Sequence, residues 1–181
     1  MALPATDAVQ AIAFLRHLFK PYSDGVIEIR PLSKHRPHAN RTTYRLPECL
    51  KGEEGQALSQ HIISLAMRGY DVYVGVCPRV APEGPGRKLG KDAIEQVGAV
   101  WVDLDSKVPG ASSEVLLNTC DIVVSSGNGW HGYKILTSPK LCKSARERTT
   151  LEYRIRDFAD KLLPGTDNVS NLDRILRVPG T

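Results

Sequence analysis

One apolar stretch that ends in two carboxylates, Ala-Val-Trp-Val-Asp-Leu-Asp at residues 99–105, constrains the fold more than any other part of the chain. A strand alternates its side chains between two faces, so Asp103 and Asp105 should leave a sheet on the same face as Trp101. Two carboxylates held that close repel each other unless one is protonated or divalent cations lie beside them. The spacing therefore indicates a hard-metal site, although the same pattern occurs at loop entrances and helix caps.

The composition is that of an ordinary globular protein. The 181 residues, 41% of them hydrophobic and 24% charged, suit one domain that could have two lobes. The net charge of +4 comes from basic residues that cluster at positions 34–41, 87–91 and 140–148. Such clusters fit a polyanionic partner and fit a solvated basic surface equally well.

The cysteines and the N-terminal segment indicate a cytoplasmic protein. The four cysteines are far apart and form no Cys-x-x-Cys pair, which is typical of reduced, buried thiols. The first apolar segment contains Asp7 and Arg16 and has no basic region before it, so we expect neither a signal peptide nor a membrane span. His35 and His38 lack a carboxylate or cysteine partner, and a phosphate contact or no ligand at all is expected there.

Periodicity predicts an α/β (α+β) chain. Apolar residues recur at helical spacing in residues 7–19, 53–68, 112–117 and 143–163, and extended patterns lie at 26–30, 71–77, 99–105, 121–126, 131–136 and near the C-terminus. We expect the strand at 26–30 to lie at a sheet edge. We interpret residues 1–181 as a single domain, in which residues 1–70 form an N-terminal portion and residues 71–181 carry the motifs.

Residues 78–96 lack apolar periodicity and are rich in Pro, Gly and basic residues, which predicts a mobile loop. It directly precedes the Asp-x-Asp strand. A cationic loop in that place could grip nucleic acid through Arg79, Arg87, Lys88 and Lys91. A surface insertion without a ligand explains the same composition.

Ser-Gly-Asn-Gly-Trp-His at residues 126–131 joins two extended segments, which predicts a β-hairpin. The backbone N–H groups of Gly127 and Gly129 could also approach a phosphate, with Ser126 and His131 beside them. From these residues alone the plain hairpin is the simpler interpretation.

The C-terminal segment combines acids with two arginines. Asp167 lies in a loop, and Asp173 precedes a strand expected to carry Arg174 and Arg177. A guanidinium group can bind two phosphate oxygens at once, so the arginines could hold a phosphate. An Asp173–Arg177 ion pair on the surface would explain the same pattern.

The order of the three stretches resembles the archaeo-eukaryotic primase superfamily, in particular the primase-polymerases of plasmids, phages and mobile elements. The resemblance runs from about residue 73 to the end and includes Tyr-Val-Gly-Val-Cys-Pro-Arg at 73–79. The first 70 residues carry no matching motif. Relatives continue through a further strand and usually a helical domain, so the resemblance implies that the chain is a fragment truncated at its C-terminus.

The resemblance implies a two-lobed catalytic core with a lobe like an RNA-recognition motif. It implies two Mg²⁺ or Mn²⁺ ions held by Asp103, Asp105 and a third acid, for which we expect Asp167 rather than Asp173. Triphosphate contacts would come from the side chains and backbone of these residues: Ser126, Gly127, Gly129, His131, Lys134, Arg174 and Arg177. The implied partners are nucleoside triphosphates, a single-stranded DNA template with its primer, and a replicative helicase in the same polypeptide or operon.

Two other functions fit some of the same residues. A metal-dependent nuclease would use the acids to activate water but has no evident use for the segment at 126–131. A non-catalytic nucleic-acid-binding module of a replication initiator would explain the basic residues but not the carboxylates. These alternatives stay open at the level of the sequence.

Overall fold

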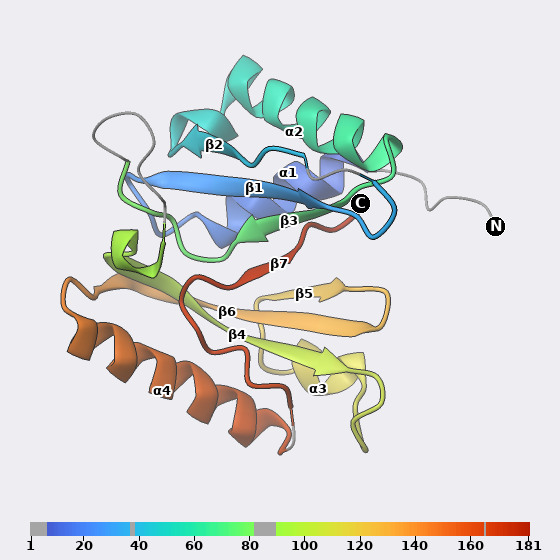
Figure 1. Cartoon of the computed structure of the whole chain (residues 1–181). Coiled ribbons are helices and arrows are strands. Elements are labelled where there is room, and N and C mark those ends of the chain that lie inside the picture. The colour runs from blue at the N-terminus through green and yellow to red at the C-terminus, as the bar shows by residue number, and fades with distance from the viewer. Residues whose placement is uncertain (1–6, 37–38, 82–89, 165) are drawn as a thin grey trace.

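The computed structural model describes residues 7–36, 39–81, 90–164 and 166–181, which form two antiparallel sheets with helices around them (Figure 1). The first sheet has the strand order β2-β1-β3-β7, with β1 at Val26–Leu32, β2 at Thr42–Arg45, β3 at Asp71–Gly75 and β7 at Ile175–Arg177. The second sheet has the order β4-β6-β5, with β4 at Gln96–Asp105, β5 at Ile122–Ser125 and β6 at Gly129–Leu141. The chain builds most of the first sheet, then the whole second sheet, and returns to the first sheet with β7.

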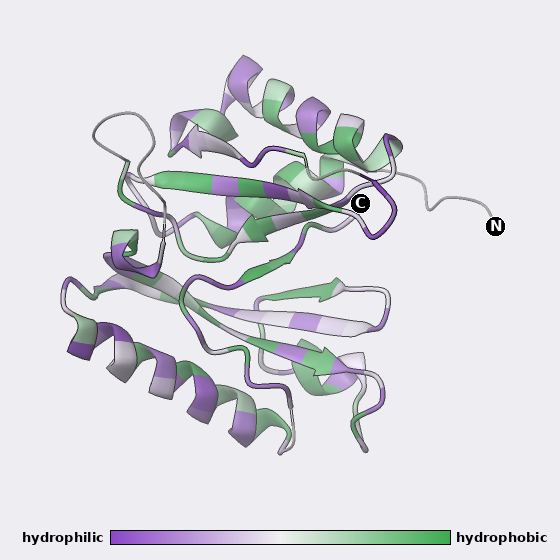
Figure 2. Ribbon diagram, viewed as in Figure 1, coloured by the Kyte–Doolittle hydropathy of each residue, from purple (hydrophilic) through white to green (hydrophobic). Residues whose placement is uncertain are grey.

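Four α-helices and two short 3₁₀ helices complete the described fold. They are α1 (Ala8–Leu18), η1 (Glu48–Leu50), α2 (Gly52–Met67), η2 (Lys91–Ala93), α3 (Ser113–Leu117) and α4 (Ala145–Leu162). The start of α1 is set by Asp7, whose carboxylate accepts from the backbone N–H groups of Val9 and Gln10. At the start of α4, Ser144 and Glu147 form a reciprocal capping box. Hydrophobic and hydrophilic bands alternate along α2 and α4 (Figure 2), as expected for helices that pack on one side only.

A continuous core joins the two sheets. Helices α1 and α2 pack against each other and against the face of the first sheet that carries Ile27, Ile29 and Val74. Phe14 of α1 also reaches Tyr133 of β6, and the two rings meet edge to face with their centroids 5.5 Å apart. Helix α1 therefore ties the first sheet to the second.

A smaller apolar cluster covers the opposite face of the second sheet. Val102 and Leu104 of β4 pack there with Leu116 of α3 and Ala159 of α4. Since these two β4 residues face the helices, Asp103 and Asp105 face the first sheet, as the period-two pattern of residues 99–105 predicts.

The mixed α/β class is confirmed, and one of the finer predictions was wrong. Strand β1 is not at an edge, because β2 and β3 pair with its two sides. The short strand β2 was not expected. Strand β3, at the start of the motif-bearing portion, pairs with β1 of the N-terminal portion in the same sheet, so both portions contribute to one domain.

The predicted loop at 78–96 is ordered at both of its described ends. Arg79 forms an isolated bridge with Val26, and Val80 donates a hydrogen bond to the carbonyl of Ala93 at 2.8 Å. Residues 82–89, which include Arg87 and Lys88, lie outside the described residues, as does His38. Within the described ranges, no helix combines the length and apolarity needed to cross a bilayer.

Replacing Phe14 with Ala should destabilise the whole fold, because Phe14 is 5% exposed and links the two sheets. We expect a loss of about 3–5 kcal/mol in the free energy of unfolding, measured by denaturant titration. Val9→Ala on the same helix is the control, since Val9 is 74% exposed and should change stability little. Equal stability of the two variants would show that α1 does not hold the sheets together.

Candidate active site

The pairing of β4 with β6 places the Asp-x-Asp motif beside the hairpin. Asp103 lies opposite His131, and Asp105 lies opposite Gly129. Paired residues of an antiparallel ladder project from the same face, so the carboxylate of Asp103 and the imidazole of His131 are neighbours. Gly129 has no room for a side chain, because a Cβ there would collide with the carbonyl oxygen of Leu104. The glycine thus allows the close approach of the two strands at the motif.

Residues 126–129 form the turn of the predicted hairpin between β5 and β6, which is confirmed. The N–H of Ser126 donates to the carbonyl of Gly129 at 2.9 Å and closes the turn. Gly127 adopts φ +90°, a backbone conformation that glycine adopts at little cost. The phosphate contact of this turn stays a prediction.

Residues 166–172 are fastened to the second sheet and to α4. The indole N–H of Trp101, a residue of the Asp-x-Asp strand, donates to the carbonyl of Val169 at 2.8 Å. The N–H of Leu172 donates to the carboxylate of Glu152 in α4 at 2.9 Å. These buried and half-buried bonds set the path of the segment that carries Asp167.

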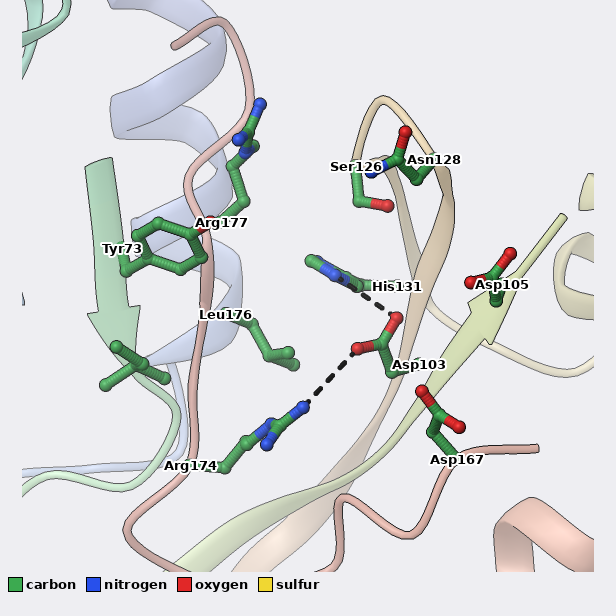
Figure 3. A pocket seen from close by; sticks show the side chains of 11 residues that line it. Tyr73, Asp103, Asp105, Ser126, Asn128, His131, Asp167, Arg174, Leu176 and Arg177 are labelled. Atoms are coloured by element: carbon green, nitrogen blue, oxygen red, sulfur yellow. Dashed lines mark ion pairs between the residues drawn. The ribbon is translucent and has the colours of Figure 1, made fainter. Parts of the chain in front are cut away.

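The three stretches meet at one pocket of about 310 Å³ between the two sheets. Figure 3 shows Asp103 at its centre, flanked by Asp105 and Asp167, with the turn at Ser126 above and the arginines on the side of the first sheet. The lining residues are Tyr73, Asp103, Asp105, Ser126, Asn128, His131, Asp167, Arg174, Ile175, Leu176 and Arg177.

Asp103 is the electrostatic centre of this pocket. Its Oδ2 lies 3.6 Å from Arg174 Nη2, and its Oδ1 lies 3.5 Å from His131 Nε2. Burial raises the pKa of Asp103, Arg174 opposes that rise, and the nearby charges of Asp167 and Asp105 add to it. Three carboxylates therefore crowd one pocket, and Arg174 offsets part of their repulsion.

His131 is a neutral imidazole at physiological pH. Burial, and then the positive charges of Arg174 and Arg177, lower its pKa to about 4. Its contact with Asp103 is therefore not a charged ion pair. His131 Nδ1 and Arg174 Nε are buried, and neither has a hydrogen-bond partner within the described part of the chain. Such orphaned polar atoms beside a pocket are places where a polar ligand would complete the bonding.

The structure brings Asp167 into the pocket and leaves Asp173 out of it. Asp167 lines the pocket with the two acids of β4. The carboxylate of Asp173 instead accepts from the side-chain amide of Asn171 at 2.8 Å. The alternative of an Asp173–Arg177 ion pair is corrected, because Arg177 pairs with Asp71 at 2.9 Å. Arg177 lies in β7 as expected, whereas Arg174 precedes that strand.

Three basic residues expected to bind ligand lie elsewhere. Arg79 is buried and lies 3.5 Å from the carboxylate of Glu28, so it is not part of a basic surface. Lys134 projects from the other face of β6 than His131 and pairs with Asp121 at 2.9 Å. Lys91 is in contact with Glu152 of α4 at 2.7 Å. We therefore leave all three out of the site proposed below.

Sequence reasoning assigned no site role to Tyr73 or Asn128, which also line the pocket. Asn128 lies within the hairpin turn that had been singled out for its glycines. Tyr73 alternates with the buried Val72 and Val74 in β3, and this alternation shows that it faces away from the core. The surroundings of the Tyr73 side chain depend on the pairing of β3 with β7, and no short sequence pattern predicts that pairing.

The carboxylates have the oxygen atoms that a divalent cation prefers, but their side chains are not positioned to bind one together. Asp103, Asp105 and Asp167 supply only oxygen donors, which Mg²⁺ and Mn²⁺ prefer. In residues 7–36, 39–81, 90–164 and 166–181, however, no three His, Cys, Asp or Glu side chains converge as metal ligands. Asp103 faces Arg174, and Asp105 accepts from the N–H of Lys107 at 2.8 Å. Metal binding would require these side chains to turn toward one another.

Comparison of the chain with protein-family models, curated proteins and solved structures finds no match to any of them.

Replacing Trp101 with Phe should loosen the segment that carries Asp167, because it leaves the buried carbonyl of Val169 without its donor. We expect a loss of about 1–3 kcal/mol in unfolding free energy. Amide hydrogen exchange should speed up in residues 166–172 more than in α1. Uniform acceleration over both regions would mean that Trp101 only fills space.

Proposed function

We propose that the chain is the catalytic core of a primase-polymerase of the archaeo-eukaryotic type, which adds nucleotides to a DNA strand on a single-stranded template. The two-lobed core with a lobe like an RNA-recognition motif is part of this proposal. The observation that carries it is the meeting of three distant stretches, at 103–105, 126–131 and 167–177, around one pocket.

The acids of the pocket would hold the metal ions. Asp103, Asp105 and Asp167 are the ligands that we assign, and bound Mg²⁺ or Mn²⁺ would stabilise negative charge on the attacking and leaving oxygens. Before a cation binds, Arg174 partly neutralises Asp103 from 3.6 Å. This arrangement keeps the repulsion among the acids low in the ligand-free protein.

The opposite wall of the pocket would receive the triphosphate. The side chains of Ser126 and Asn128 in the turn offer hydrogen-bond donors, and Arg174 and Arg177 offer positive charge. The unpartnered atoms His131 Nδ1 and Arg174 Nε are consistent with a polar ligand here. A triphosphate placed between arginines and acids would draw Arg174 toward its phosphates and free Asp103 for the cation.

Asp103→Asn combined with Asp105→Asn should abolish nucleotide incorporation, because it removes two of the three carboxylates at almost constant volume. The assay contains a primed single-stranded template, deoxynucleotides, and Mg²⁺ or Mn²⁺. The matched control is Asp157→Asn with Asp160→Asn, which removes two exposed acids from α4 that take part in i,i+4 ion pairs.

Incorporation by the pocket variant at the control's rate would overturn the metal assignment. The same assay separates the other functions. Shortened strands with wild-type protein would indicate the nuclease, and a shifted DNA complex without synthesis would indicate the non-catalytic module.

Asp167→Asn should lower incorporation by at least a hundredfold and weaken Mn²⁺ binding, whereas Asp173→Asn should change either quantity less than threefold. The two variants make the same charge change six residues apart, and of the two acids only Asp167 lines the pocket. Single-turnover incorporation and Mn²⁺ titration measure the effects. Loss of Mn²⁺ binding in Asp173→Asn alone would reverse the assignment of the third acid.

A further inference from the structure

Four residues form a row across the face of the first sheet that α1 and α2 leave open. The β1–β3 register sets Arg30 opposite Tyr73, and the β3–β7 register sets Tyr73 opposite Arg177. Continuing the β1–β2 register by one residue sets Arg41 opposite Arg30. Opposed residues project from the same face, so Arg41, Arg30, Tyr73 and Arg177 lie side by side. We call these four residues the arginine row.

A buried carboxylate lies beneath one end of the row. Glu28 is fully buried, and Arg30 Nε donates to its Oε1 at 2.9 Å. Arg41 Nη1 lies 4.0 Å from the same oxygen, and Arg79 Nη2 lies 3.5 Å from Oε2. A single carboxylate thus faces three guanidinium groups, which fixes their positions but does not neutralise them.

The row keeps an excess of positive charge. Its second carboxylate is Asp71, which pairs with Arg177 at 2.9 Å. The three arginines of the row thus face two carboxylates, and one of these, Glu28, is shared with the buried Arg79. Arg30 and Arg41 remain open to solvent, with side chains 35% and 43% exposed. Charges that are held in place and still accessible can exchange water for phosphate oxygens.

The row leads into the pocket. Tyr73 and Arg177 line the pocket, and Arg30 and Arg41 extend the same face away from it, over β1 and toward β2. The row runs from the residue before β2 across β1 and β3 to β7 and therefore spans about 14 Å. A series of charges over that length suits a polymer of phosphates better than a single phosphate group. The Arg177 guanidinium lies over the Tyr73 ring, 5.8 Å from its centroid, so this ring within the row already stacks with a flat cationic group.

We propose that the arginine row binds the backbone of a single DNA strand and guides it into the pocket, with Tyr73 as the face on which a base stacks. This inference rests on the proposed function in one respect, namely that the strand is the template. Backbone contacts from arginine and base stacking on an aromatic ring are how proteins bind single strands without reading sequence.

The test measures binding of a fluorescein-labelled single-stranded oligodeoxynucleotide by anisotropy, without nucleotides or metal. Arg30→Gln with Arg41→Gln removes two charges from the row. Arg146→Gln with Arg154→Gln removes two charges from exposed positions of α4 and is the matched control. We expect Kd to rise at least tenfold for the row variant and less than threefold for the control.

The salt dependence gives a second readout. Loss of two phosphate contacts should make the negative slope of log K against log salt shallower by about 1.4, since each single-strand contact contributes about 0.7. The control should keep the slope of the wild type. Equal losses of affinity in the two double variants would overturn the proposal, because the location of the charges would then not matter.

Arg30 also contacts the buried Glu28, so the double variant could fail to fold. Arg41→Gln alone avoids this problem, because Arg41 is exposed and only touches Glu28 at 4.0 Å. With an unchanged melting temperature, it should still bind DNA at least threefold more weakly than Arg146→Gln. Wild-type affinity in this single variant would overturn the proposal.

Failure of the row and failure of the catalytic proposal give different results. DNA binding that depends on the row, without nucleotide incorporation by the wild type, would support the row and contradict the polymerase. Incorporation by the wild type together with full DNA affinity in the row variant would support the polymerase and contradict the row.

Discussion

The pairing of β7 with β3 is the constraint on which the site depends. Arg174 accepts from the N–H of Val76 at 3.0 Å just before β7, and the N–H of Val178 donates to Val72 at 2.9 Å just after it. These bonds return the end of the chain from the second sheet to the first. Without this return, the arginines would not face the acids of β4, and neither sheet alone would form the pocket.

The second constraint is the anchoring of residues 166–172 before they reach β7. Trp101 holds this segment from the strand that also carries Asp103 and Asp105. One strand therefore places all three acids, two directly and Asp167 through a buried hydrogen bond to its neighbourhood. Because β4 both carries two acids and anchors the segment with the third, acids more than 60 residues apart in sequence line the same pocket.

Repulsion among the three carboxylates opposes their placement in one pocket, and the positive charge of Arg174 offsets part of this repulsion. Burial raises the pKa of Asp103, Arg174 opposes the rise, and the neighbouring carboxylates add to it. Glu28 is the inverse case, a buried acid surrounded by three guanidinium groups. The protein thus holds an acidic pocket beside a basic sheet face. A polyanionic substrate and divalent cations would complement the two regions, which links the proposed chemistry to the proposed path of the strand.

Short-range patterns predicted much of this structure. The period of two placed Asp103 and Asp105 on one face, and Asn-Gly between extended runs predicted the hairpin. The preference for Asp167 over Asp173 as a metal ligand came from the spacing within the resemblance and stays a prediction, although Asp167 does line the pocket.

Long-range partners could not be predicted in this way. Arg79 looked like a surface cation because its partner Glu28 lies 51 residues earlier and only the β1–β3 pairing brings them together. Residues 26–30 predicted an edge strand because Glu28 and Arg30 alternate with apolar residues, and the four-residue β2 that pairs with β1 has no apolar pattern to reveal it. The arginine row could not be predicted for the same reason, since its members lie in β1, β3, β7 and just before β2 and are brought together only by strand register.

The most direct measurement of the central claim is a crystal structure of the protein with Mn²⁺ and a non-hydrolysable deoxynucleoside triphosphate, with Mn²⁺ located by its anomalous signal. The account predicts Mn²⁺ between Asp103, Asp105 and Asp167, with Arg174 turned from Asp103 toward the phosphates and the triphosphate against Ser126 and His131. Mn²⁺ bound elsewhere, or a triphosphate outside this pocket while Arg174 keeps its contact with Asp103, would contradict the account.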